Sequence, residues 1–518
     1  MGSPSKNGSS TGPASAFAEA GLARTVKAVC EEIRELYKSD GTPWVVGYSG
    51  GKDSSAALQL VWLAIRELSA AERTKTVHVI STDTLVEQPL VAAWVDASLA
   101  RMSTAAGEQG LPFVPHKLTP EVENTFWVNL IGKGYPAPRN KFRWCTERLK
   151  IMPSNKFIRD VVRSSGEAIL VLGTRKAESQ RRAITMSKLE SKRVRERLTP
   201  NASLPNSLVY TPIEDWNNDD VWLFLMQLKN PWGHDNKSLL GMYQGATEGG
   251  ECPLVVDSST PSCGTSRFGC WVCTVVEKDR SMEAMIKNDE EKVWMTPLLE
   301  LRNELDNPDD RSLRDFRRMN GHVQLFHDRT IPGPYTKASR EHWLRRVLEA
   351  QEQARREGPP EFRNLKLITM DELHEIRRIW LNEKHEFDDS LPRIFQEVTG
   401  QEFPRRDIDN NPLRTEDWTL LKEVCGEDEA FFDLQVRLLG IEQSHRGMSR
   451  RAGIFEKLES RFRSAFYRSE QEAVDDLTDR DRRTRAATDQ AKGEPVPHSR
   501  VVEKQLGLLR DDLERVEE

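Results

Sequence analysis

The sequence predicts an α/β fold, a doubly wound and mostly parallel sheet, joined to a cysteine-rich segment and a C-terminal helical domain. Three observations lead to this prediction. Short apolar runs alternate with helical patterns over residues 18–235, as in a sheet whose parallel strands are linked by helices. Four of the seven cysteines fall within residues 252–273. After about residue 280 the strand signals fade, and charged helical patterns continue to about residue 467.

The first strand runs into a glycine-bearing turn and then into an apolar helical run over residues 56–68. Such a turn can expose backbone N–H groups to a phosphate at a helix N-terminus. Hydroxyls and Lys52 would add donors and a charge, while Asp53 is placed to hold Mg²⁺ or to cap the helix. The spacing is not that of a Walker A loop. The phosphate-binding residues expected here are Ser49, Gly50, Gly51, Lys52, Asp53, Ser54 and Ser55.

Further strands are predicted over residues 76–81, 113–118, 168–173 and 208–213. The carboxyl ends of parallel strands face the ligand crevice of an open α/β sheet, so residues that follow strands are candidates for the site. Asp83 follows the second strand, although a helix N-cap explains its position equally well. Gly173 and Arg175 follow the fourth strand. Three charged residues, Glu178, Arg181 and Arg182, come soon after and would face the same crevice.

Cys145 lies in a basic, glycine-bearing loop over residues 132–148 that leads into a helix. A thiol near a helix N-terminus and between Arg143 and Arg148 is expected to have a lowered pKa and to be a good nucleophile. A buried, inert cysteine is the alternative. We interpret the loop as flexible and Cys145 as a catalytic candidate.

Four cysteines with the spacing C-x₁₀-C-x₆-C-x₂-C can gather around one metal centre. In a reducing compartment a metal site is favoured over disulfides. Spacing alone leaves zinc and an iron–sulfur cluster open. The expected ligands are Cys252, Cys263, Cys270 and Cys273.

The net charge of −6 excludes a polyanion-binding surface over the whole protein, so any such surface must be local. Residues 181–198 contain seven basic side chains against two glutamates, and residues 446–468 contain another basic run. A solvated helix face is the plain alternative for both. No apolar run nears the roughly 20 residues needed to span a bilayer, so we expect a cytoplasmic protein with no membrane partner.

The expected organisation has five parts. They are a disordered tail (1–17), the α/β domain (18–235), the cysteine-rich segment (236–290), the helical domain (291–470), and a linker with a short amphipathic helix (471–518). Within the last part, an apolar residue recurs every three or four positions from Val502 to Val516, too briefly for a helix to stand alone.

Four motifs carry a family resemblance: the Ser-Gly-Gly-x-Asp-Ser turn at 49–54, Arg-Trp-Cys-Thr at 143–146, Leu-Gly-Thr-Arg at 172–175, and Cys-Gly-Thr-Ser-Arg-Phe-Gly-Cys-Trp-Val-Cys at 263–273. The turn resembles the pyrophosphate loop of ATP pyrophosphatases. The chain as a whole resembles the phosphoadenosine phosphosulfate reductase-like superfamily, which has the adenine nucleotide alpha hydrolase-like fold. Within it the chain is similar to the DndC-type DNA phosphorothioation sulfurtransferases.

This resemblance implies ATP and Mg²⁺ at the turn, a [4Fe-4S] cluster on the four cysteines, and sulfur replacing a non-bridging oxygen of a DNA phosphate. It implies DNA, a cysteine desulfurase as sulfur donor, and other proteins of a DNA modification complex as partners. Lys52, Asp53 and Cys145 become the catalytic candidates, with Cys145 as sulfur carrier and not a cluster ligand. The alternatives are a sulfonucleotide reductase, against which the lack of adjacent cysteines argues, and a nucleotide-binding subunit without chemistry of its own.

Overall fold

The computed structural model describes residues 14–195, 197–201, 203–247, 268–404, 415–448, 450–464, 467 and 469–493. The chain divides into two compact units. The first comprises Met1–Leu313 and Tyr335–Trp418, and the second comprises Arg314–Pro334 and Thr419–Glu518. No helix among the described residues is long and apolar enough to cross a membrane.

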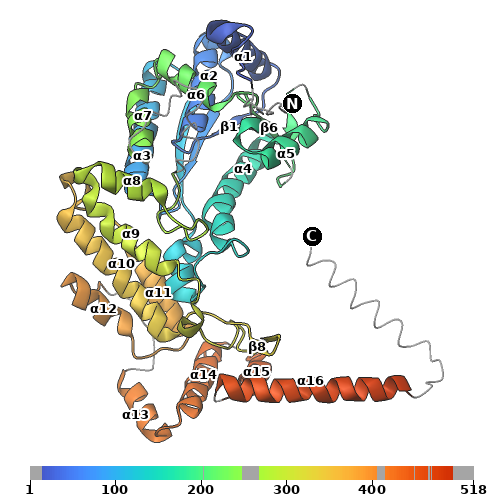
Figure 1. Cartoon of the computed structure of the whole chain (residues 1–518), viewed down its shortest axis with the longest axis vertical. Coiled ribbons are helices and arrows are strands. Elements are labelled where there is room, and N and C mark those ends of the chain that lie inside the picture. The colour runs from blue at the N-terminus through green and yellow to red at the C-terminus, as the bar shows by residue number, and fades with distance from the viewer. Residues whose placement is uncertain are drawn as a thin grey trace, which may run out of the picture. The chain divides into compact units, whose positions relative to one another are not determined.

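The first unit is built on a six-stranded sheet with the order β3-β2-β1-β4-β6-β5 (Figure 1). All pairings are parallel except that of β5 with β6. The predicted doubly wound, mostly parallel sheet is therefore confirmed. The added strand β5 has only two residues, too few to leave a pattern in the sequence. The strands are β1 (Trp44–Gly47), β2 (Val77–Thr82), β3 (Phe113–Leu118), β4 (Ala168–Val171), β5 (Thr199–Pro200) and β6 (Ser207–Tyr210).

Helices cover both faces of this sheet. On one face α1 (Gly21–Lys38), α2 (Lys52–Arg66), α3 (Pro89–Glu108) and α6 (Asn218–Gln227) share one apolar core with the strands. On the other face α4 (Met152–Ser165) packs through Ile158 and Val161 against Val45, Ile80 and Leu170. Figure 1 shows α3 and α4 on opposite sides of the sheet. The predicted apolar run after the turn is α2, whose central residues are buried on nearly every side.

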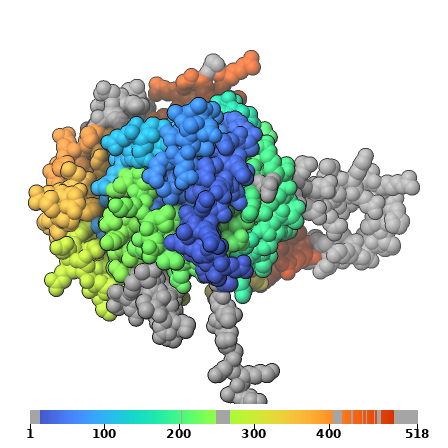
Figure 2. Space-filling model, turned by 90° about the horizontal axis from the view of Figure 1, so that it is seen from above, coloured from blue at the N-terminus to red at the C-terminus, as the bar shows by residue number. Residues whose placement is uncertain are grey.

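The segment after the sheet is helical. It contains α7 (Asn236–Gly245), α8 (Arg280–Asn288), α9 (Thr296–Leu305), α10 (Lys337–Glu357), α11 (Met370–Asn382) and α12 (Ser390–Thr399). In the view of Figure 2, the blue N-terminal helices and the green segment with α6 and α7 lie side by side. Short helical turns fill the connections: η1 (Ala70–Glu72), η2 (Val122–Asn124), η3 (Val128–Lys133), η4 (Thr146–Ile151), η5 (Lys176–Glu178), η7 (Glu290–Met295), η8 (Arg311–Leu313) and η9 (Pro360–Phe362).

Helices α8 to α12 do not form a domain of their own. A second apolar core joins them to residues from the middle of the α/β region, with Trp127, Trp271, Leu298 and Trp343 at its centre. Trp127 donates its indole N–H to the carbonyl of Leu367 at 2.7 Å. The helical domain predicted over residues 291–470 is therefore divided, because its residues up to Trp418, apart from 314–334, belong to the first unit.

Among its described residues, the second unit holds a small hairpin, β7 (Leu325–Phe326) with β8 (Arg329–Thr330), and a set of helices. The helices are α13 (Thr415–Cys425), which begins in the first unit, α14 (Glu429–His445), α15 (Ile454–Ser464) and α16 (Glu470–Gly493). Arg317 ties the hairpin region to this unit by donating to the carbonyl of Tyr467 at 2.8 Å. The apolar repeat predicted over 502–516 lies outside the described residues.

Residues 14–17 fall within the predicted disordered tail (1–17), but they are part of the fold. Ser15 is hydrogen-bonded to Asp220, and the backbone N–H of Ala16 donates to the same carboxylate at 3.0 Å. Phe17 is buried, with its ring centroid 5.0 Å from that of Trp216. The end of this segment therefore closes one face of the sheet domain.

We expect Trp127→Phe to lower the free energy of unfolding of the first unit by about 1–3 kcal/mol, because the buried carbonyl of Leu367 loses its donor. Trp343→Phe is the matched control. That indole lies in the same core, but its N–H has no hydrogen-bond partner among the described residues. Urea unfolding followed by tryptophan fluorescence measures the two differences. Equal losses for both variants would mean that packing alone joins these segments.

Candidate active site

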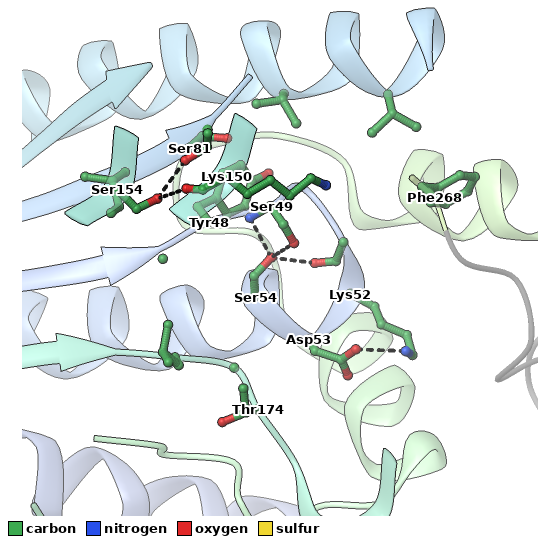
Figure 3. Close-up of a pocket in the computed structure, with 18 of the residues that line it drawn as sticks. Tyr48, Ser49, Lys52, Asp53, Ser54, Ser81, Lys150, Ser154, Thr174 and Phe268 are labelled. Carbon is green, nitrogen blue, oxygen red and sulfur yellow. Dashed lines mark hydrogen bonds and ion pairs between the residues drawn. The ribbon is translucent and has the colours of Figure 1, made fainter. Parts of the chain in front are cut away.

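The turn after β1 folds back onto the first turn of α2. The N–H of Ser49 donates to the hydroxyl of Ser54 at 3.1 Å, and that hydroxyl lies 3.0 Å from the carbonyl of Gly51. Gly50 has a φ of +75°, a conformation that favours glycine, and a Cβ there would lie 2.5 Å from Val95. Figure 3 shows Ser49, Lys52 and Ser54 around the N-terminus of α2. The predicted glycine-bearing turn between a strand and a helix is present.

The end of β4 lies directly against this turn. A Cβ on Gly173 would lie 2.4 Å from the carbonyl oxygen of Asp53, so only glycine allows the two backbones to approach this closely. Two residues later, Nε of Arg175 lies 2.7 Å from the Asp53 carboxylate. The other oxygen of that carboxylate lies 2.9 Å from Nζ of Lys52. Asp53 therefore holds two buried cations in place at the turn.

A cavity of about 1010 Å³ opens at the carboxyl ends of the central strands, as the fold predicts. Asp83 lies in its wall, paired with Lys117 at 3.0 Å, and accepts the N–H of Leu85 at 2.8 Å. The helix-cap alternative for Asp83 is wrong, since Gln88 caps α3. The predicted site residues that line the cavity are Ser49, Gly51, Lys52, Asp53, Ser54, Asp83, Gly173 and Arg175.

Two residues that the sequence predicts to contact a phosphate, Ser55 and Gly50, do not line the cavity. Ser55 has 2% of its surface exposed and does not line the cavity. Gly50 is not in the cavity wall either, and its carbonyl accepts the indole N–H of Trp94 at 3.2 Å. Both residues shape the turn from outside the cavity. The alternation of neighbouring residues around a helical turn puts Ser54 and Ser55 on different sides.

Sequence reasoning missed several residues of the cavity wall. The hydroxyl of Tyr243 accepts the N–H of Lys52 at 3.4 Å, and its ring lies under the ammonium of the same lysine. Lys150, Ser154 and Phe268 also line the cavity (Figure 3). Lys150 follows the Arg-Trp-Cys-Thr motif closely and could have been suspected, whereas nothing in the sequence marks Tyr243.

Cys270 and Cys273 lie on a turn that contacts the cavity wall. The sulfur of Cys270 is 3.4 Å from the Thr84 hydroxyl and 3.8 Å from Glu87. Glu87 lines the cavity together with Lys150, and the two are 3.3 Å apart. Burial, with the Glu87 carboxylate second, raises the pKa of Cys270 to about 12, so without a metal this sulfur stays a thiol. One glutamate thus contacts the cysteine turn and forms part of the cavity wall.

A buried arginine supports the cysteine turn. Arg302 is 1% exposed and donates to the carbonyls of Cys273 and Glu277, each at 3.0 Å, and to that of Val276. Asp306 pairs with Arg302 and also with Arg139 of the loop that precedes Cys145. The described cysteines are free. Cys252 and Cys263 lie outside the described residues, and the described residues alone contain no group of three metal-ligating side chains.

The environment of Cys145 differs from the prediction. Burial, followed by nearby Cys273, raises the pKa of its thiol above the ordinary value. Neither arginine lowers the pKa of this thiol, and their guanidinium groups bond other side chains, Arg143 that of Asn140 and Arg148 that of Asn129. The expected thiolate stabilisation is therefore wrong.

The loop that carries Cys145 is anchored and not a free arm. Trp144 is 8% exposed and donates to the carbonyl of Pro136, while the hydroxyl of Thr274 donates to that of Pro138 at 2.6 Å. The loop is thus bonded to the residue that follows Cys273. Cys145 does not line the cavity, but it packs against the same apolar core as Cys270.

The basic run over 181–198 is partly neutralised. Arg193 pairs with Glu214 at 2.8 Å, and Arg195 pairs with both Asp40 and Glu167. Arg197 and Arg182 are also paired with glutamates, the latter inside the cavity wall. In the second run Arg451 pairs with Glu442, and Arg468 lies outside the described residues. A count of basic residues therefore overstates the positive charge that either run presents to solvent.

We expect Gly173→Ala to abolish nucleotide binding while the protein stays folded, because the added methyl must push the backbone of residue 173 away from Asp53. Gly107→Ala is the control, since nothing lies within 4 Å of a Cβ at that position of α3. Calorimetric titration with ATP tests both variants. Wild-type affinity in Gly173→Ala would show that the two backbones can separate without loss of the site.

Comparisons with known proteins agree with the fold of the sheet domain. Residues 43–275 match the family described as phosphoadenosine phosphosulfate reductase domain. The uncharacterized protein MJ0066 of Methanocaldococcus jannaschii is 25% identical over 262 residues, which cover 51% of this chain. The match spans only 42% of the length of that relative.

Among solved structures, the U34-tRNA thiolase NcsA from Methanococcus maripaludis with its [4Fe-4S] cluster is 15% identical. That match covers 55% of this chain and 80% of the thiolase, with a TM-score of 0.27, too low to support a conclusion. The family match covers the turn, the cavity and the cysteine turn alike. Residues 43–275 are therefore similar to the phosphoadenosine phosphosulfate reductase domain family over 233 of the 518 residues of the chain.

Proposed function

We propose that the protein is an ATP-dependent sulfurtransferase that activates a DNA backbone phosphate with ATP, releases pyrophosphate and inserts sulfur as a phosphorothioate. Members of the matched family are enzymes, and ATP binding is typical of them. One observation carries the proposal. Glu87 and Lys150 belong to the wall of the phosphate-binding cavity, and Glu87 also contacts the thiol of Cys270. A site for phosphate activation and a thiol site thus share one wall.

ATP fits the cavity with its phosphates at the turn. The N-terminus of α2 offers N–H groups and a positive dipole end, and Lys52 and Arg175 offer charge. Mg²⁺ usually binds one or two carboxylates besides phosphate oxygens, and Asp53 and Asp83 are the carboxylates nearest this role. Because both oxygens of Asp53 already face cations, Mg²⁺ at Asp53 would exchange with Lys52 or Arg175.

In the proposed reaction a non-bridging oxygen of the DNA phosphate attacks the α-phosphorus of ATP, and pyrophosphate leaves with the electrons of the broken bond. AMP on the DNA phosphate is then a good leaving group. The terminal sulfur of a persulfide attacks the DNA phosphorus, and AMP departs with the former DNA oxygen. A thiol finally cleaves the S–S bond between product and carrier, and is itself oxidised to a disulfide with the carrier.

Cys145 remains the proposed sulfur carrier, charged as a persulfide by a cysteine desulfurase of the same DNA modification complex. The proposal that Cys145 carries sulfur rests on the position of this residue and not on a lowered pKa of its thiol. The loop before Cys145 is bonded through Pro138 to Thr274, next to Cys273. Transfer from this site requires either that the DNA phosphate reach beyond the Glu87 wall or that the loop move toward the cavity.

The thiols of the cysteine turn are suitable ligands for a metal centre. Cys270 and Cys273 are free thiols, and Arg302 holds their turn in one conformation. Thiol ligands suit an iron–sulfur cluster or zinc, and Cys252 and Cys263 would complete the set of four. A [4Fe-4S] cluster bound there would supply a redox-active centre.

A sulfonucleotide reductase is the second candidate, because the matched family bears that name. Cluster-bearing reductases have adjacent cysteines and a cysteine near the C-terminus in a Glu-Cys-Gly-x-His type tail. Here no two cysteines adjoin, and the last one is Cys425 in Val-Cys-Gly-Glu. Release of sulfite from adenosine phosphosulfates would favour this second candidate.

The first functional prediction concerns the products of ATP cleavage. Wild-type protein is expected to form AMP and pyrophosphate, and Lys52→Ala or Ser54→Ala to abolish this, because both side chains line the cavity at the turn. Lys27→Ala and Ser164→Ala remove an exposed lysine and a serine outside the cavity as controls. Chromatography of the nucleotides gives the answer. ADP and orthophosphate as products would contradict the assignment of the turn.

The second functional prediction separates the cysteines. Protein purified without oxygen is expected to be brown, with about four irons per chain. Cys270→Ser and Cys273→Ser should lose iron and colour, whereas Cys145→Ser should keep both and lose sulfur insertion into DNA. Iron analysis, absorbance and mass spectrometry of digested DNA measure these outcomes. Loss of iron in Cys145→Ser would make it a metal ligand, and stoichiometric zinc without iron would reject the cluster.

A further inference from the structure

Helix α5 (Gln180–Glu190) buries none of its eleven residues. A surface helix of this length usually packs a stripe of apolar residues onto the protein. Here Ile184 is 70% exposed, and Val194, just beyond the helix, is 66% exposed. The helix is held mainly by η5 and β5. Its outer face is therefore not used by the fold.

That outer face carries an ordered set of side chains, which we call the α5 stripe: Arg181, Ile184, Lys188 and Lys192. Arg181, Ile184 and Lys188 are separated by three and four positions, so they lie on one side of the helix within about 60°. Lys192 follows directly after Ser191, which ends the helix. In the stripe, the apolar side chain of Ile184 therefore lies between cationic side chains.

The cations of the stripe differ from the other basic residues of this region. Within the part of the chain that the structure describes, no ion pair involves Arg181, Lys188 or Lys192. The acidic residues nearest to them are already engaged, since Glu190 pairs with Lys176 and Glu178 with Arg182. The stripe therefore presents three positive charges to solvent, although the whole chain is negative.

The stripe begins at the rim of the cavity. Ser179 caps α5 by accepting the N–H of Arg182, and Arg182 and Glu178 line the cavity itself. A chain of phosphates lying along α5 would therefore lead from the stripe toward the phosphate-binding turn. A partner with charges at regular intervals and apolar sugar or base edges between them matches cations that flank an isoleucine.

We propose that the α5 stripe is the surface that holds the DNA backbone next to the reacting phosphate. The inference rests on the proposed function for its substrate and adds the place where that substrate is held. Arg181, Lys188 and Lys192 neutralise backbone phosphates, and Ile184 packs against sugars between them. Arg193 and Arg195, which belong to the same basic run over residues 181–198, serve ion pairs within the fold instead.

The test compares two triple variants with the same change in net charge. The stripe variant is Arg181→Gln, Lys188→Gln and Lys192→Gln. The control variant is Lys27→Gln, Lys156→Gln and Arg163→Gln, which removes three exposed cations that are paired with carboxylates elsewhere in the first unit. Binding of a fluorescent DNA duplex is measured by anisotropy over a series of salt concentrations, without ATP or sulfur donor. Circular dichroism and thermal melting verify that both variants are folded.

The stripe variant is expected to bind the duplex more weakly, with a slope of log affinity against log salt shallower by about 2.7, as three lost phosphate contacts require. The control is expected to keep the wild-type slope. A stripe variant with the wild-type slope, or equal losses in both variants, overturns the inference. So does loss of binding to anionic phospholipid vesicles with DNA binding unchanged.

Failure of the proposed function has a different signature. If wild-type protein makes no phosphorothioate with ATP and a sulfur donor, but the stripe variant still loses duplex binding with the expected change of slope, the surface stands and the reaction is wrong. If phosphorothioate forms while the stripe variant binds as wild type, the reaction stands and the DNA is held elsewhere. Ile184→Ser adds a second readout and should weaken binding with no change in the salt slope.

Discussion

The backbone of Gly173 lies so close to the first turn of α2 that no side chain fits between them. This approach joins the ends of two neighbouring strands, β1 and β4, at the point where both leave the sheet. It also brings Arg175 within 2.7 Å of Asp53, whose other oxygen holds Lys52. The positions of the cations around the turn after β1, and hence the shape of the cavity, depend on this contact of two backbones.

The turn that carries Cys270 and Cys273 is held in place by helix α9. Arg302 of α9 holds the carbonyls of Cys273, Val276 and Glu277, and Asp306 of the same helix pairs with Arg139. The helices after residue 280 are therefore part of the architecture that places the thiols. A charged group buried in this way is stable only when its donors are used, which explains why three carbonyls and a carboxylate surround one guanidinium.

Ion pairing decides which charges of this protein can act on a partner. Arg193, Arg195 and Arg197 contribute to the positive charge of their segment in the sequence, but each faces a carboxylate from another part of the chain. The partners come from distant segments, such as Asp40 before β1. The cations of α5 remain exposed because only the start of the helix reaches the cavity and the helix packs mainly on η5 and β5.

The sequence by itself determined the five main strands, the turn after the first of them and the helix that follows, because these features depend on local patterns of apolar residues and glycines. It also placed Asp83, Gly173 and Arg175 at the cavity, since strand ends in a parallel sheet meet at one edge. Only the tertiary structure decided the surroundings of Ser55, Cys145 and Tyr243. Exposure and the pKa of a thiol depend on side chains that come from distant segments, and no local pattern records those neighbours.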